Sequence, residues 1–458
     1  MSDTLVAHIL DNDQLAIKLG QEFWRSFDIP GTNRDSTVED YLLAHPLLIN
    51  EHFKYDEYRP IVDAVTRESL AHPEQGRCEG KVVYLVWGIT SRISPQEGES
   101  MIRYAADALY RERAKEVNLI TYLFKGRQDM DPALRFNKKR FSGKSPDEVK
   151  KLEEKLESIK GESFSLEVML QGLFQSGIRN IITLNAHSYE STKRVLRRVF
   201  NWYKVFGEEH GLPNSPSIDK IFYDIDSMPI FAHYIKYNLS RVLDFGDEGE
   251  NLVLLSLDKG DWGRTDMVYD LLGLKNMLVL YLDKDREIPD DPSNLSCLID
   301  HIRTKDGRID CKDIEDVRQV TNISGKILLL PDDIINTGGT IFEPLHLFSD
   351  GMPEYVFAFA PNSTLPPRTG VYKKIYDNRV NIVTSDSHPN LQTHRERGAT
   401  QITVLSFAKY FADIIRSYVS KSRPLPSSLF TPGNLEEVGN LYEIVTKGRE
   451  FVPYRIGE

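Results

Sequence analysis

The stretch KILLLPDDIINTGGTI, residues 326–341, decides the fold of this chain. Its segment 327–330 is apolar without alternation, which is typical of a strand buried on both faces of a parallel sheet. Two adjacent carboxylates, Asp332 and Asp333, follow where that strand ends, and an apolar helical pattern begins near Phe342. Ligands of open α/β sheets bind beyond the carboxyl ends of the strands, so we expect this stretch to border a binding site.

The segment TGGT, residues 337–340, suits a phosphate group. Its glycines let backbone N–H groups approach a phosphate, its hydroxyls add donors, and the following helix presents its positive N-terminus. The paired carboxylates before it can accept hydrogen bonds from vicinal sugar hydroxyls. An acidic surface turn would use similar residues, but strand, acids, glycine loop and helix occur here in the required order. The stretch therefore predicts a pocket for a sugar phosphate.

The composition limits the class of protein. At 458 residues the chain is too long for one ordinary core, and two domains are expected. A net charge of −11 argues against a nucleic-acid-binding protein. The cysteines Cys78, Cys297 and Cys311 are widely spaced, as expected of reduced thiols in the cytoplasm. We expect no signal peptide and no membrane span, because no segment has the required apolar length.

Strands and helices alternate along the first part of the chain. We expect strands at 81–88, 118–124 and 180–184, because these segments are short and apolar. Helical periodicity is present at 97–115 and 162–175. Such alternation predicts a parallel sheet with helices on its faces.

A second series of the same kind begins near residue 251. We expect strands at 252–257, 277–282, 327–330, 355–360 and 381–384, and helices at 264–272 and 407–419. The segment 227–241 is the expected crossing between the series. The predicted parts are a first domain 1–233 with insertions at about 130–160 and 189–217, a second domain 234–430, and a C-terminal extension 431–458.

The stretch 326–341, with its two carboxylates and its TGGT segment, resembles the phosphoribosyl-diphosphate loop of type I phosphoribosyltransferases and ribose-phosphate pyrophosphokinases. The usual form of that loop is Asp-Asp-x-x-Asp-Thr-Gly-Gly-Thr, and Asn336 here replaces its third acid. The resemblance implies that Asp332 and Asp333 hold the ribose hydroxyls. It also implies that the 5-phosphate is held by Thr337, Gly338, Gly339 and Thr340, and that Asn336 belongs to the same ribose 5-phosphate site. The loop alone does not separate the two classes.

The segment TYLFKGRQD, residues 121–129, is similar to a strand end of the pyrophosphokinases that holds ATP. The resemblance implies ATP contacts from Arg127, Gln128 and Asp129. An arginine can pair with phosphates and stack on a base, and a glutamine adds polar contacts.

Two further segments of the first part resemble the same family. Residues 181–188, IITLNAHS, resemble a strand ending in Asp-Leu-His, which implies that His187 lies beside Mg²⁺; Asn185 stands where an Asp is usual. Residues 53–57, FKYDE, resemble a Phe-x-x-Gly-Glu segment that reaches a neighbouring subunit's adenine, although its glycine is missing here; the resemblance implies ATP-binding roles for Asp56 and Glu57.

The second series carries two more matches. Residues 256–260, SLDKG, resemble a Ser-Pro-Asp-Ala-Gly turn, which implies that Asp258 contacts Mg²⁺ or a ribose hydroxyl; Asp261 replaces a second glycine. Lys284 and Arg286 resemble the Lys-x-Arg pair of the family's mobile catalytic loop. Two cations on a loop can close over a transferred group and stabilise its charge.

The resemblance covers most of residues 80–430, including a closing stretch at 404–430, and implies two tandem type I phosphoribosyltransferase-like domains. The implied reaction is Mg²⁺-dependent diphosphate transfer from ATP to ribose 5-phosphate for nucleotide biosynthesis. Relatives assemble as homo-oligomers, from dimers to hexamers, in the cytoplasm. Two alternatives stay open: a non-catalytic regulatory paralogue that binds an active synthetase, and a phosphoribosyltransferase that acts on a base.

Overall fold

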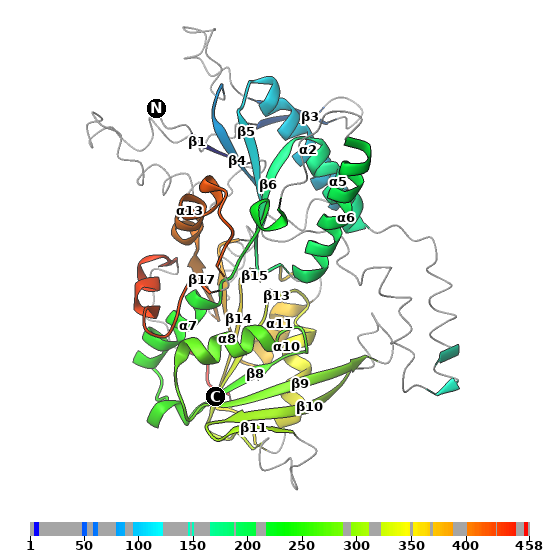
Figure 1. The fold of residues 1–458 in the computed structure, drawn as a ribbon. Coiled ribbons are helices and arrows are strands. Elements are labelled where there is room, and N and C mark those ends of the chain that lie inside the picture. The colour runs from blue at the N-terminus through cyan, green and yellow to red at the C-terminus, as the bar shows by residue number, and fades with distance from the viewer. Residues whose placement is uncertain are drawn as a thin grey trace, which may run out of the picture. The chain divides into compact units, whose positions relative to one another are not determined.

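The chain forms two compact units, one ending at Asp224 and the other beginning at Ile225 (Figure 1). This division precedes the predicted boundary after residue 233, so the segment 225–233 belongs to the second unit. The computed structural model describes residues 4–8, 48–52, 58–62, 79–87, 95–121, 145–146, 149–150, 165–186, 189–207, 217–286, 295–310, 322–348, 351–366, 370–387, 401–426, 428–445 and 453–456.

The first unit is built on a five-stranded sheet with the order β1-β4-β5-β6-β7. The strands are β1 (Thr4–His8), β4 (Val82–Trp87), β5 (Glu116–Thr121), β6 (Ile178–Leu184) and β7 (Phe222–Ile225). The pairs β1–β4, β4–β5 and β5–β6 are parallel, so the three strands expected here are confirmed as β4, β5 and β6. A separate antiparallel pair joins β2 (Leu48–His52) and β3 (Tyr58–Val62).

Three helices supply the core of this unit: α2 (Pro95–Arg111), α5 (Ser165–Gln175) and α6 (Tyr189–Gly207). Their apolar residues pack against alternate residues of β4 and β5, because successive strand side chains point to opposite faces. The helix α6 lies in the segment 189–217, which was expected to be an insertion. Val195, Leu196 and Val199 of α6 are fully buried in the core, so this segment contributes a core helix. A 3-10 turn, η4 (Ile218–Lys220), leads into β7.

The second unit contains a nine-stranded sheet with the order β11-β10-β9-β8-β12-β14-β16-β17-β18. The strands are β8 (Leu252–Ser256), β9 (Leu278–Arg286), β10 (Leu295–Thr304), β11 (Gly307–Asp310), β12 (Ile327–Pro331), β14 (Tyr355–Ala360), β16 (Val380–Ser385), β17 (Ile402–Ser406) and β18 (Glu443–Ile444). The six strands from β9 to β17 in this order are parallel to their neighbours, and the outer pairs are antiparallel. A short parallel pair joins β13 (Ile334–Ile335) and β15 (Asn362–Ser363).

Helices lie on both faces of this sheet. The α-helices are α7 (Met228–Tyr237), α8 (Trp262–Leu272), α10 (Gly339–Phe342), α11 (Val371–Asp377) and α13 (Ala408–Ser417). The 3-10 turns are η5 (Leu239–Arg241), η6 (Asp247–Gly249), η9 (Glu343–Phe348), η11 (Val419–Lys421) and η12 (Leu435–Asn440). On one face Leu345 and Ile375 join the core formed by alternate strand residues, and on the other Phe231 of α7 packs on Phe359 of β14. Within the described residues, no helix is long and apolar enough to cross a membrane.

The segment 431–458, expected to be an extension, is joined to the second unit. Its strand β18 pairs with β17, and Val438 of η12 is fully buried. The hydroxyl of Tyr442 accepts a hydrogen bond from Asn238, 2.8 Å away, at the end of α7. The described part of this segment is therefore an integral part of the second domain.

Candidate functional site

The strands β8 and β12 form a topological switch point in the second unit. They are neighbours in the sheet, yet the chain passes from β8 through α8 to β9 on one side, and from β12 to β14 on the other. Connections that diverge in this way leave a crevice beyond the carboxyl ends of the two strands, where α/β proteins bind ligands. Asp258 follows β8 and Asp332 follows β12, so both lie at this crevice.

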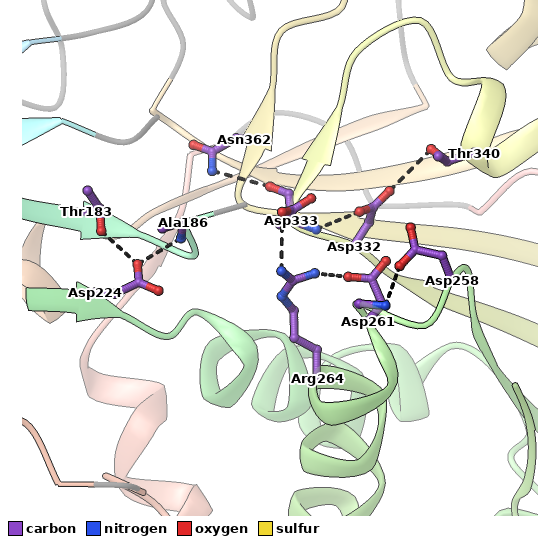
Figure 2. A network of polar contacts seen from close by, with 11 residues as sticks. Thr183, Ala186, Asp224, Asp258, Asp261, Arg264, Asp332, Asp333, Thr340 and Asn362 are labelled. Atoms are coloured by element: carbon purple, nitrogen blue, oxygen red, sulfur yellow. Dashed lines mark hydrogen bonds and ion pairs between the residues drawn. The ribbon is translucent and has the colours of Figure 1, made fainter. Parts of the chain in front are cut away.

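Arg264 contacts one carboxylate that follows β8 and one that follows β12 (Figure 2). Its guanidinium forms ion pairs with Asp261, which precedes α8, and with Asp333, where Nη2 of Arg264 lies 3.2 Å from Oδ2. Asp261 and Asp333 are 5% and 3% exposed. Buried charges are costly unless they are paired, so Arg264 compensates for two of them at once. Asp261, which replaces a glycine of the resembled turn, thus holds this arginine.

Arg264 is a site residue that the sequence analysis missed. A signal was present, because an aspartate and an arginine three residues apart face each other on the first turn of a helix. What the sequence does not contain is the contact with Asp333, which follows a strand that is remote in the chain.

Asp332 is a buried carboxyl with an altered pKa. Its Oδ1 accepts the backbone N–H of Asp333 at 2.8 Å, and its Oδ2 accepts the hydroxyl of Thr340 at 3.4 Å. Burial and then the charge of Asp333 raise the pKa of Asp332 to about 8, although Arg264 acts in the opposite direction. Asp332 is therefore mostly protonated at neutral pH.

The loop 336–340 is shaped by Gly338. Its φ of 79° is left-handed, and a Cβ at this position would collide with the ring of Phe342. Among the described residues, the backbone N–H groups of 337–340 have no hydrogen-bond acceptor, so they remain available to a ligand. The exposed Asn336 accepts a hydrogen bond from the hydroxyl of Thr364 at 2.9 Å.

The helix after this loop differs from the expectation. It begins at Gly339, before Phe342, and its α-helical part has only four residues before the chain continues as the 3-10 turn η9. So short a helix has a small macrodipole. An anion here would be bound mainly by the loop N–H groups and hydroxyls.

The carboxylate of Asp258 has the chemistry of a Mg²⁺ ligand. Its Oδ1 accepts the backbone N–H of Gly260 at 2.8 Å, and its second oxygen has no partner among the described residues. No group of three or more His, Cys, Asp or Glu side chains in the described part of the chain is arranged to hold a metal ion. This donor set fits Mg²⁺, which is commonly bound by one or two carboxylates together with water and substrate phosphates.

Lys284 and Arg286 lie in a strand, which corrects the expectation of a loop. Both belong to β9, where the antiparallel register with β10 pairs Lys284 with Cys297 and Arg286 with Leu295. The strands β9 and β10 have 9 and 10 residues, whereas the neighbouring core strand β8 has 5. The pairing of β9 with β10 therefore extends the sheet beyond the end of β8. The structure describes the backbone of these two residues.

The residues predicted to bind ATP lie outside the described residues. These are Asp56, Glu57, Arg127, Gln128 and Asp129, and the predicted metal ligand His187 is also outside. The turn that leads to His187 is described: Asp224 accepts hydrogen bonds from the Thr183 hydroxyl and the Ala186 N–H, both at 2.8 Å. Asn185 has a φ of 47°, a left-handed conformation that asparagine adopts more readily than most residues. This explains an asparagine at the turn.

Comparison with known proteins finds similarity among solved structures. No family model matches the sequence, and no curated protein matches it. A solved structure, phosphoribosylpyrophosphate synthetase from Mycobacterium smegmatis, is similar with a TM-score of 0.53 and 16% sequence identity, over 91% of this chain and 99% of that one. This likeness shows the fold. The chain has two tandem type I phosphoribosyltransferase-like domains, each with a mainly parallel sheet flanked by helices, as the sequence predicted.

Proposed function

We propose that this chain transfers diphosphate from ATP to the C1 hydroxyl of ribose 5-phosphate, forming 5-phosphoribosyl 1-diphosphate and AMP for nucleotide biosynthesis. The observation that carries the proposal is the switch point between β8 and β12, which is bordered by Asp258, the pair Asp332–Asp333 and the loop 337–340. Carboxyl groups beside a glycine loop match a small ligand that carries both vicinal hydroxyls and a phosphate. The likeness to a phosphoribosylpyrophosphate synthetase supports this choice.

Ribose 5-phosphate would bind at the end of β12. The N–H groups of 337–340 would hold the 5-phosphate, with Asn336 and the threonine hydroxyls adding polar contacts. Asp333, held by Arg264, would accept a hydrogen bond from one ribose hydroxyl. Asp332 in its protonated form can both donate and accept, so it suits the neighbouring hydroxyl.

ATP would bind through the first domain and the reaction would need alignment and charge stabilisation more than covalent chemistry. Lys284 and Arg286 would stabilise the charge of the diphosphate group as it moves. The ATP-binding residues would be Arg127, Gln128, Asp129, Asp56 and Glu57. Assembly as a homo-oligomer, a dimer or a hexamer, belongs to the same proposal.

Mg²⁺ would be held by Asp258 and His187 together with phosphate oxygens. When bound, the ion would neutralise phosphate charge. The protein contributes the turn 258–260 to this site. There the Gly260 N–H donates to one oxygen of Asp258, which orients the carboxylate so that its second oxygen can bind the ion.

A regulatory paralogue without turnover is the second candidate, and Asn336 favours it. A neutral amide, hydrogen-bonded to Thr364, occupies a position where the resembled loop has an acid. Such a protein would bind ribose 5-phosphate and an active synthetase without forming AMP. A phosphoribosyltransferase acting on a base is the third candidate, and it would consume phosphoribosyl diphosphate instead of making it.

The deciding experiment supplies purified protein with ATP, ribose 5-phosphate and varied Mg²⁺, and measures AMP and phosphoribosyl diphosphate. We expect both products in equal amounts. Lys284→Ala should lower kcat by about 10²–10³-fold and preserve ribose 5-phosphate binding, because it removes charge stabilisation from the transition state. Lys305→Ala, at the exposed turn of the neighbouring β10–β11 hairpin, is the matched control and should retain activity. Folded wild-type protein that binds ribose 5-phosphate but forms no AMP would instead support the regulatory candidate.

A further inference from the structure

The turn 258–261 is tied to the strand that carries Lys284 and Arg286. Trp262, the first residue of α8, donates its indole N–H to the backbone oxygen of Leu282 at 3.2 Å. Lys259 in the turn forms an ion pair with Asp283 of β9. The turn that contains Asp258 and the first residue of α8 therefore each make one bond to β9, immediately before Lys284.

Trp262 is also part of a cluster of aromatic rings at the same place. His301 of β10 stacks on Tyr281 of β9, with ring centroids 4.1 Å apart, and meets the Trp262 ring edge-on at 4.8 Å. Tyr281 and His301 are 2% and 3% exposed. The cluster thus packs α8 against both strands of the β9–β10 hairpin.

A β-bulge lies beside this cluster. The register pairs His301 with Tyr281 and Ile299 with Leu282, so Asp300 is the extra residue. Bulges bend a strand and increase its twist, so the direction of the hairpin beyond this point is set here. We call that outer part, residues 282–286 of β9 and 295–299 of β10, the arm.

The polar contacts of His301 stabilise the bulge. Its Nδ1 lies 2.8 Å from Oδ2 of Asp300, to which it donates in the tautomer that carries the Nδ1 proton, and 3.1 Å from a guanidinium nitrogen of Arg308 in β11, from which it accepts in the other tautomer. Hydrogen bonding with His301 is the largest cause that lowers the pKa of Asp300. The buried Nε2 of His301 has no hydrogen-bond partner among the described residues. An unpaired buried nitrogen costs free energy, and a phenylalanine ring could stack here without that cost. Stacking alone therefore does not account for a histidine at this position.

We propose that His301 and Trp262 are positioning residues that fix the arm, and with it Lys284 and Arg286, relative to the turn 258–261. Trp262 joins the turn to the inner end of the arm, and His301 holds the bulge from which the arm departs. The consequence for catalysis rests on the proposed function, in which Lys284 and Arg286 act on the transferred group. A displacement of about 1 Å at a reacting group can lower a rate by about 10²-fold.

Hydrogen exchange of the full-length chain tests the structural part without any substrate. In His301→Ala, amides of the arm should exchange at least about ten-fold faster, whereas amides of β12 and β14 keep their rates. His301→Phe, which keeps the ring, should retain part of the protection. Ile309→Thr, at a 39% exposed position of β11, is the control and should leave the arm unchanged. Unchanged exchange in the arm, or equal acceleration throughout the sheet, would overturn the proposal.

Kinetics test the catalytic part. In His301→Ala and in the milder Trp262→Phe, kcat should fall by about 10- to 100-fold while KM for ribose 5-phosphate stays within about two-fold, because the binding loop lies elsewhere. A rise in KM with normal kcat would contradict the assignment. If the wild-type protein forms no AMP, the proposed function fails and the exchange experiment still decides whether His301 and Trp262 position the arm.

Discussion

Replacing Asp332 by asparagine should make the protein more stable at neutral pH and should weaken its sugar-phosphate site. The carboxyl is 4% exposed, and its pKa rises from 3.8 to about 8 on folding, chiefly through burial and then through Asp333. Asparagine has nearly the same shape, its oxygen can accept the Asp333 N–H as the carboxyl does, and it does not ionise. The substitution therefore removes the pH-dependent cost of Asp332 and retains its packing.

The sign and size of the effect follow from proton linkage. Since the folded pKa is raised, the stability that this group contributes is fully present below pH 4 and is lost as the pH rises toward about 8. Each pH unit inside this window costs about 1.4 kcal/mol, so the cost at pH 7 is at most about 4 kcal/mol. Between pH 5 and pH 7, the advantage of Asp332→Asn over wild type should grow by about 2–3 kcal/mol.

Urea unfolding of both proteins at several pH values measures this difference through the transition of the second domain. Asp306→Asn, at an exposed position with the same change of charge, is the control and should show no comparable trend. Calorimetry should also show at least ten-fold weaker binding of ribose 5-phosphate to Asp332→Asn, because an amide NH2 at the position of Oδ2 cannot accept the hydrogen bond from Thr340 of the binding loop. An advantage that does not change with pH, or one that shrinks as pH rises, would refute the assignment of a raised pKa.

One further substitution and one truncation test the architecture. Arg264→Leu should destabilise the protein by about 3–5 kcal/mol in urea unfolding, because Asp261 and Asp333 would stay buried without their cation; a loss below about 1 kcal/mol would contradict the role given to the ion pairs. Truncation after residue 430 should leave little soluble folded protein, as judged by circular dichroism and gel filtration, because β17 would lose its edge partner and the buried η12 would be removed. A truncated chain that melts like the full-length protein would show that the segment is dispensable.

The regular parts of the fold could be predicted because a strand that is buried on both faces is a continuous apolar run in the sequence. The segments 327–330 and 355–360 are continuous apolar runs, and both form central strands of the second sheet. The β10–β11 hairpin was not predicted, although the pair Asp306–Gly307 at its turn is a turn signal. Its strands mix charged and apolar residues, because the hairpin lies at the edge of the sheet.

The tertiary structure decided which residues share an environment. The sequence indicated Asp332, Asp333 and the glycine loop by itself, since their order along the chain reflects one strand and its turn. It did not indicate that Arg264 pairs with Asp333, because that contact requires β8 and β12 to be neighbours. The same holds for the segment 431–458, whose strand β18 is too short to have a pattern of its own and is stabilised by its pairing with β17 and by the ion pair of Glu443 with Lys409.

The sequence by itself thus determined the two α/β series and the chemistry of the loop 326–341, because hydrophobic pattern and turn chemistry are local properties. The raised pKa of Asp332, the ion pairs of Arg264 and the aromatic cluster at Trp262 were decided by the tertiary structure alone. The pKa depends on burial, and the ion pairs and the aromatic cluster depend on distances between segments that are remote in the chain. The pKa of a carboxyl changes when folding removes its water, and for Asp332 that burial also strengthens the effect of the adjacent Asp333.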